Sequence, residues 1–64
     1  MSKYDAYDVL FPCEILMENG TWEPGEVLAT QDTEHGMAAF IRWQGIHAWF
    51  FRCQVDEPDE WRRI

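Results

Sequence analysis

From residue 9 onward, apolar and polar side chains alternate in short runs, and turn-forming residues separate these runs. The first run, residues 9–17, has one apolar face that consists of Cys13, Ile15 and Met17. Successive side chains on a β-strand point to opposite faces, so a period of two residues is typical of a strand buried on one side. We therefore predict a strand in residues 9–17 whose Cys13 face lies toward the core.

Turn signals divide the rest of the chain into further strands. Glycine tolerates a positive φ at no steric cost, asparagine tolerates it better than most residues, and Pro-Gly is another common turn pair. These signals lie at Asn19-Gly20, Pro24-Gly25 and Gln44-Gly45. The intervening polar segments, residues 31–36 and 54–60, are predicted to form loops. The remaining strands are predicted in residues 25–30, 37–43, 46–53 and 61–64.

The strand predicted in residues 46–53 is the most aromatic one, and both of its faces are apolar. Its two faces are Ile46, Ala48, Phe50 and Arg52 on one side, and His47, Trp49, Phe51 and Cys53 on the other. Alternation alone leaves open which face is buried. We expect one of them to meet a partner or another subunit, because a large exposed apolar surface usually marks an interaction site.

Together these elements predict an all-β chain that forms a small antiparallel barrel of about five short strands. The 64 residues allow one domain, and we assign residues 9–64 to the barrel and residues 1–8 to an N-terminal arm. Trp61 is expected to pack against the core from the last strand. Four Trp and four Phe make a compact core feasible without a disulfide or a metal. Homo-oligomerisation stays open.

The formal net charge is -7, from twelve Asp and Glu against five Lys and Arg. This charge disfavours direct nucleic-acid binding, which needs basic residues to displace counterions from phosphates, and it disfavours an anionic membrane surface. A basic protein or peptide suits the charge best, although a solvated acidic surface alone would also account for it. No secretory signal or apolar stretch of membrane-spanning length is visible, so a cytoplasmic protein is expected.

The spacing of nucleophiles and metal ligands gives no support to enzyme chemistry. Cys13 and Cys53 lie far apart, and together with His35 and His47 they lack the close-spaced ligand pairs of a zinc site. In a reducing compartment both cysteines are expected to be buried thiols. Acidic residues 56–60 lack the alternating ligands and the glycine of a calcium loop. We predict a chain with no catalytic residue, no metal site and no cofactor.

The pattern Gly20-x-Trp22-x-x-Gly25-x-Val27, followed by a polar loop and by Phe40-Ile41-x-Trp43-x-Gly45, resembles the SH3-like small barrels. Tudor-like and chromo-like domains belong to this broad group. The resemblance covers residues 9–64 and rests on the placement of turns and aromatic residues. It implies the architecture of a small barrel and carries less information about function.

One enzyme family with this architecture, the plasmid-borne type II dihydrofolate reductases, assembles short SH3-like chains into tetramers around a central pore. Trp22, Gly25 and Val27 are similar to a stretch of that family that carries Trp, Gly and Ile or Val. The pore motif of the family, Val-Gln-Ile-Tyr, has no counterpart here, because the corresponding strand reads His47-Ala48-Trp49-Phe50-Phe51. No catalytic role is therefore transferred to this chain.

Aromatic side chains near a carboxylate are the best candidates for a binding site. Such a group attracts a cation, for example a Lys or Arg side chain, and Tudor-like domains use cages of this kind. Trp22 and Trp49 are expected to make the main contacts, although these aromatics would pack in the core if they do not bind. The predicted binding site consists of Trp22, Glu23, Trp43, Trp49 and Phe51.

The function favoured by the sequence is a small acidic, non-enzymatic interaction module that binds a basic protein or peptide through an aromatic surface. One alternative is an acidic inhibitor, of the kind that phages and other mobile elements encode, which mimics the charge of a nucleic acid. Such a mimic needs carboxylates spread along one face at phosphate-like intervals. A second alternative is an oligomeric enzyme of type II dihydrofolate reductase-like architecture, with its active pore between subunits.

Overall fold

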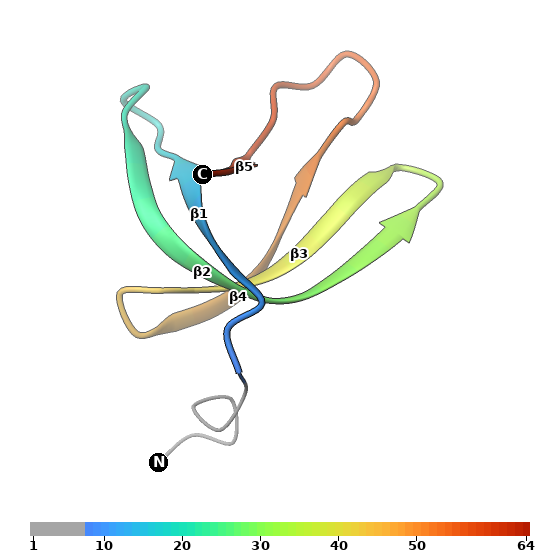
Figure 1. The fold of residues 1–64 in the computed structure, drawn as a ribbon. Helices are drawn as coiled ribbons and strands as arrows, with labels where there is room; N and C mark the ends of the chain where they lie inside the picture. Colours follow the sequence, from blue (N-terminus) through green and yellow to red (C-terminus); the bar gives the residue numbers. More distant parts are fainter. Residues whose placement is uncertain (1–7) are drawn as a thin grey trace.

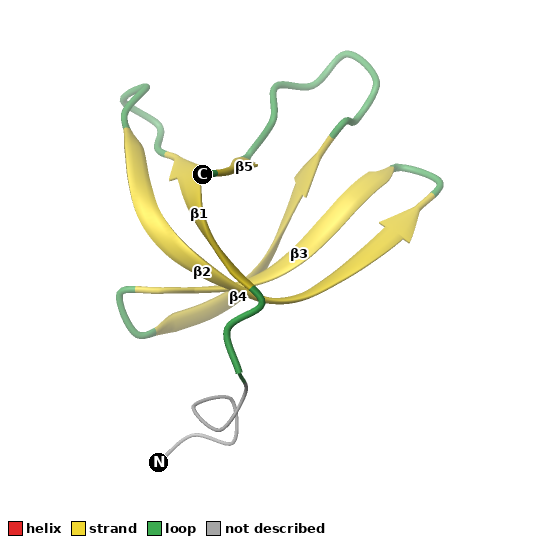
Figure 2. Ribbon diagram, in the orientation of Figure 1, coloured by secondary structure: helices red, strands yellow, loops and turns green. Residues whose placement is uncertain are grey.

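The computed structural model describes residues 8–64, so the predicted N-terminal arm lies outside the described residues except for Asp8. The described part is all β, with no helix (Figure 2). None of it therefore forms a helix with the length and apolarity needed to cross a membrane. The strands are β1 (Phe11–Leu16), β2 (Trp22–Thr33), β3 (Gly36–Trp43), β4 (Ile46–Arg52) and β5 (Trp61–Arg63).

The five strands form one antiparallel sheet in the order β4-β3-β2-β1-β5, which confirms the all-β class and the number of strands. The sheet is bent into a cup, as Figure 1 shows. The predicted closure into a barrel is not seen, because β4 and β5 are the two edges and do not pair as strands. Glu60 nevertheless links both sides: its N–H donates to the carbonyl of Phe51 (2.9 Å), and its carbonyl accepts from the N–H of Leu16 (2.9 Å).

The concave face of the sheet holds the hydrophobic core. Trp61 from β5 is 1% exposed, which confirms that the last strand packs its tryptophan inward. Phe50 and Met17 are half-buried and pack against the same cluster. The predicted inner face of the first strand is therefore confirmed. The fully buried members of the core are Cys13, Ile15, Val27, Ala39, Ile41 and Trp61.

The register between β3 and β4 decides which face of β4 lies inside. Ala48 pairs with Ile41, so it shares a face with a fully buried core residue. Trp49 pairs with Phe40 and points to the convex side, because successive side chains alternate. The face of β4 that carries Ala48 and Phe50 therefore lies toward the core, and the face with Trp49 and Phe51 lies outside.

The predicted turn at Pro24-Gly25 is wrong, since both residues lie inside β2. A Cβ on Gly25 would lie 3.0 Å from Cγ2 of Ile41 and 3.2 Å from Cδ1 of Ile15, so glycine serves close packing here. Pro24 is tolerated in the strand because β2 pairs only with β1 at this point. The ladder with β3 begins at Glu26.

The predicted loop at residues 31–36 is also wrong in extent. The ladder between β2 and β3 continues to the pair Thr33 and Gly36, so only Glu34 and His35 form the turn. The hydroxyl of Thr33 donates to the carbonyl of Gly36 (2.7 Å) and accepts from the N–H of His35 (3.1 Å). Gln31, Asp32, Glu34 and His35 are exposed, so the polar side of this hairpin hides its strand character in a pattern based on burial.

The other two turns are confirmed, each with its own stereochemistry. At Asn19-Gly20 only the glycine has a positive φ, of 87°. The Asn19 side chain instead accepts hydrogen bonds from the N–H of Thr21 (3.1 Å) and from its hydroxyl (2.7 Å). At Gln44-Gly45 both residues have positive φ, of 48° and 77°, which matches the primed turns of two-residue hairpins.

The two cysteines are free thiols in different surroundings. Cys13 is fully buried, as predicted, and burial raises the pKa of its thiol from 9.0 to about 11, with smaller contributions from the Glu14 and Glu26 carboxylates. Cys53 is exposed, so its predicted burial is wrong. It follows the end of β4 with a positive φ of 62°, which turns the chain away from the sheet.

Candidate functional site

The predicted binding residues divide between the two faces of the sheet. Glu23 and Trp43 line one groove on the concave side, at the open end between the β1–β2 hairpin and β3. Trp49 and Phe51 lie on the convex face of β4. Trp22 begins β2 and pairs with Leu16 at the far end of the sheet from Trp49. The single aromatic cluster that the sequence suggests is therefore not formed.

The groove around Glu23 and Trp43 has a volume of about 610 Å³. Its apolar wall includes Ile15, Met17 and Phe50, which continue the core cluster outward. Its polar rim comes from the β1–β2 hairpin and consists of Glu18, Asn19, Thr21 and Glu23. The groove thus combines an aromatic and aliphatic wall with two carboxylates.

The two carboxylates of the groove lack a cationic partner. In residues 8–64, neither Glu18 nor Glu23 makes an ion pair or a side-chain hydrogen bond. By contrast, Glu26 on β2 pairs with Arg42 at 3.1 Å. Unpaired carboxylates beside a partly desolvated wall favour a cation more strongly than fully solvated ones do, because screening by water is weaker there.

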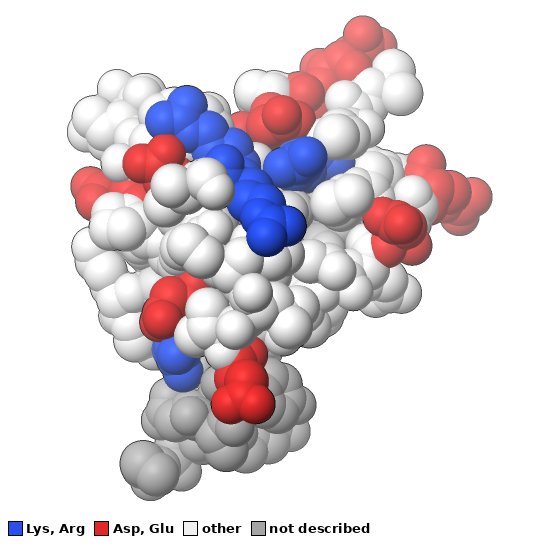
Figure 3. Space-filling view, in the orientation of Figure 1, with Lys and Arg blue, Asp and Glu red and all other residues white. Residues whose placement is uncertain are grey.

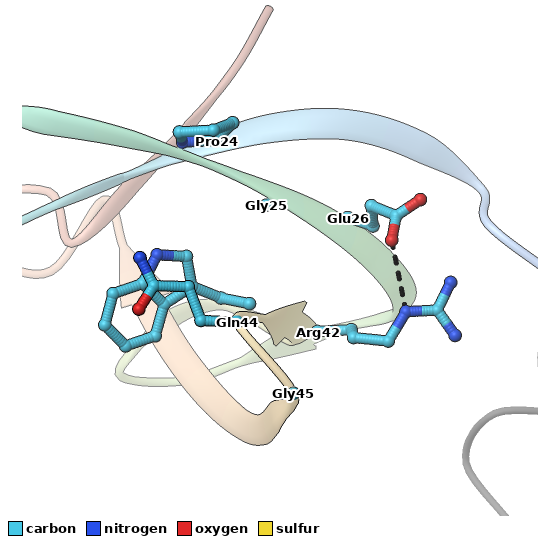
Figure 4. A pocket seen from close by; sticks show the side chains of 7 residues that line it. Pro24, Gly25, Glu26, Arg42, Gln44 and Gly45 are labelled. Atoms are coloured by element: carbon cyan, nitrogen blue, oxygen red, sulfur yellow. Dashed lines mark hydrogen bonds and ion pairs between the residues drawn. The ribbon is translucent and has the colours of Figure 1, made fainter.

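Next to this groove lies a smaller hollow of about 370 Å³ that shares Trp43 with it. Figure 4 shows the ion pair between Glu26 and Arg42 across β2 and β3. Glu26 supplies the only carboxylate among the described residues that line this hollow, and its charge is already paired with Arg42. The smaller hollow therefore attracts an external cation less strongly than the groove does.

The Trp22 ring is already in contact with a cationic side chain of the same chain, that of Arg62. The guanidinium carbon of Arg62 lies 4.0 Å from the centre of a Trp22 ring. Arg62 also pairs with Glu14: its Nε donates a hydrogen bond to Oε1 (2.9 Å), and its Nη2 lies 2.8 Å from the same oxygen. These contacts depend on the pairing of β5 with β1, 48 residues apart at Glu14 and Arg62. Local sequence patterns carry no signal for this pairing.

Trp49 is part of a separate aromatic surface on the convex side. It is 47% exposed, and its ring centre lies 5.2 Å from that of Phe40 at an interplanar angle of 42°. Phe40 also stacks with His47 at 6.1 Å. Leu28, at the bulge in β2, is buried. This surface contains no carboxylate next to Trp49 in the β3–β4 register.

Sequence reasoning identified two members of the groove and missed Glu18 and Phe50. Glu18 could have been found from its place just before the Asn19-Gly20 turn, on the same hairpin as Glu23. Phe50 could not have been found in this way, because both faces of β4 are apolar and alternation does not show which one is buried.

Residues 8–64 hold no cluster of His, Cys, Asp and Glu that could bind a metal ion. Comparison of the chain with protein-family models, curated proteins and solved structures gives no match.

Proposed function

We propose that this chain is a small non-enzymatic interaction module that binds a basic segment of another protein in the groove formed by Glu18, Glu23, Trp43 and Phe50. The proposal rests on one observation: two carboxylates without a cationic partner among residues 8–64 stand beside an aromatic wall in a single groove. Lys and Arg have an apolar stem and a cationic head, so one side chain can contact both parts.

The architecture that we propose for this module is an open variant of the SH3-like barrel. The strand order, the hairpins that join β1 to β4 and the bridge that Glu60 makes between β1 and β4 support it. We also propose a cytoplasmic location, since the two free thiols of Cys13 and Cys53 suit a reducing compartment.

The convex aromatic residues have a secondary part in this proposal. Arg62 covers a Trp22 ring, so this ring is less accessible to an external cation than an uncovered indole would be. Trp49, half exposed beside Phe51, is a second contact surface for a partner that reaches around β4. Of the five residues predicted from the sequence, Glu23 and Trp43 therefore carry the central role.

The proposal is tested with short peptides that carry Lys and Arg among neutral residues, and with acidic peptides of the same length. Binding is followed by tryptophan fluorescence and by backbone amide shifts. We expect the basic peptides alone to bind, and Glu23→Gln to weaken them about tenfold, a typical loss for one charge-assisted contact. Trp43→Phe tests the wall of the groove separately.

Glu26→Gln is the matched control, because it removes one carboxylate from the same strand but outside the groove. If Glu26→Gln weakens binding as much as Glu23→Gln, the peptide responds to overall charge and the groove is not the site. Equal binding of the acidic peptides would also overturn the proposal. Amide exchange and circular dichroism of each variant confirm that the fold is retained.

Of the two alternatives, the nucleic-acid mimic receives less support from the geometry. A nucleic-acid mimic needs a row of free carboxylates, but Glu14 and Glu26 are paired with Arg62 and Arg42. A pore enzyme needs several copies around one axis, and sedimentation of the chain at micromolar concentration distinguishes a tetramer from a monomer. We therefore retain the interaction module as the single proposed function.

A further inference from the structure

Two arginines lie against aromatic rings near the last strand. The guanidinium carbon of Arg52, at the end of β4, lies 4.7 Å from the centre of the Trp61 ring. That of Arg63, on β5, lies 4.1 Å from the centre of the Phe11 ring. Phe11 and Trp61 are themselves stacked, with centres 6.2 Å apart and an interplanar angle of 27°. The four side chains therefore form one continuous group.

Neither arginine has an anionic partner in the described residues. Arg42 and Arg62 form ion pairs, whereas Arg52 and Arg63 make no side-chain hydrogen bond or ion pair within residues 8–64. The Nε of Arg52 is buried and lacks an acceptor there. This is unexpected in a chain with twelve carboxylates and five cationic side chains, where an acidic partner should be easy to supply.

The two carboxylates that directly precede β5 are turned toward the backbone. Glu60 Oε1 accepts the N–H of Phe51 at 2.7 Å, and Asp59 Oδ1 accepts the N–H of Cys53 at 2.8 Å. Both therefore cap the edge of β4. Figure 3 shows Lys and Arg atoms gathered over the part of the surface where β5 lies in Figure 1. The fold thus leaves a basic surface within an acidic molecule.

A guanidinium that stacks on a ring keeps the in-plane N–H donors of its terminal nitrogens available for oxygen acceptors, even where Nε is buried as in Arg52. The stacking also restricts its rotamers, so less conformational entropy remains to be lost when an anion binds. We propose that Arg52 and Arg63 together form a binding site for one small tetrahedral oxyanion, such as a phosphate monoester group. This site is separate from the groove around Glu23.

The net charge favours a small anion over a nucleic acid at this site. A polyanion must bring many phosphates close to the surface, and a molecule with a net charge of -7 repels it over the Debye length. A single oxyanion contacts only the local donors. Its several oxygens can accept from both guanidinium groups, whereas a carboxylate has two oxygens that one arginine can occupy alone.

The experiment is a titration of the intact chain with inorganic phosphate at constant pH and ionic strength, with chloride as the balancing anion. The Nε–Hε resonances of the arginines are followed by NMR. We expect saturable shifts at Arg52 and Arg63 and no comparable shift at Arg42. Arg52→Gln and Arg63→Gln are each expected to weaken phosphate binding about tenfold, the usual loss for one charge-assisted donor group.

Arg42→Gln removes the same charge elsewhere and is expected to leave phosphate affinity unchanged. Arg63→Lys keeps the charge without the planar donor fork, so it is expected to bind phosphate more weakly than the parent chain while it folds normally. Shifts that rise linearly with phosphate, or that are equal at all four described arginines, would overturn the site. Acetate binding as tight as phosphate would overturn the tetrahedral preference, and tighter binding of a DNA duplex would overturn the restriction to small anions.

Discussion

At the scale of single residues, Gly25 shows how close packing fixes an amino acid. Its φ is not in the positive region, so conformational freedom is not the reason for glycine. The reason is the approach of Ile41 and Ile15, both almost completely buried, to the position of a Cβ. Neither isoleucine can move outward without a loss of core packing.

We expect Gly25→Ala to lower the free energy of unfolding by about 1–2 kcal/mol, because overpacking outweighs the smaller entropic gain from removing a glycine. Chemical denaturation measures the change. The cost should be smaller in an Ile15→Val background, since that substitution removes the Cδ1 that lies 3.2 Å from the new Cβ. Equal costs in the two backgrounds would show that the contact with Ile15 is not responsible.

Cys13 gives a pH prediction at the same scale. Its pKa is raised from 9.0 to about 11 in the folded chain, so the folded state holds the thiol proton after the unfolded state has released it. The stabilising contribution is therefore complete below pH 9 and is lost as the pH rises toward 11, by about 2 kcal/mol. Denaturation of the parent chain and of Cys13→Ala at pH 8 to 11 tests this. The variant should lose less stability across the range, and parallel curves would contradict the prediction.

At the scale of elements, β5 stabilises the fold through one side chain. β5 has three residues and pairs with β1 alone, yet Trp61 is buried among core residues from β1, β2 and β3. Trp61→Ala is expected to cost about 3–5 kcal/mol, which is comparable to the whole stability of a small domain, so most of the chain should unfold.

Arg62→Ala is the control for Trp61→Ala on the same strand. It removes the contacts with Trp22 and Glu14 on the convex face, and we expect a loss of about 1 kcal/mol. Thermal unfolding followed by circular dichroism compares the two variants. If the two losses are similar, β5 is held by its surface contacts and not by its tryptophan.

The strands could be predicted where burial alternates, and they could not where packing overrides local propensity. Residues 9–17 alternate cleanly, so the face of β1 was predictable. Pro24-Gly25 carries a strong local turn signal, but contacts with Ile41, sixteen residues away from Gly25, keep it extended. For the candidate groove, the sequence could predict some of the residues but not that they lie together. Glu23 and Trp43 stand out by residue type, whereas their shared position depends on the register of β1, β2 and β3.

At the scale of the whole molecule, charge acts at two ranges. The net charge of -7 produces a long-range field that attracts any basic partner and to which each carboxylate contributes. The groove acts only on contact, through Glu18, Glu23 and Trp43. Association and dissociation rates separate these effects, because long-range attraction speeds the encounter and short-range contacts set the lifetime of the complex.

We therefore expect the association rate of a basic peptide to fall steeply as salt rises from 20 to 500 mM, while its dissociation rate changes little. Glu26→Gln and Glu23→Gln each remove one negative charge, so they should lower the association rate at low salt by similar factors. Only Glu23→Gln should raise the dissociation rate, about tenfold, because only Glu23 lines the groove. Stopped-flow fluorescence measures both rates. A dissociation rate that both variants raise equally, or that neither raises, would mean that the peptide is held by the general field of the molecule and not in the groove beside Trp43.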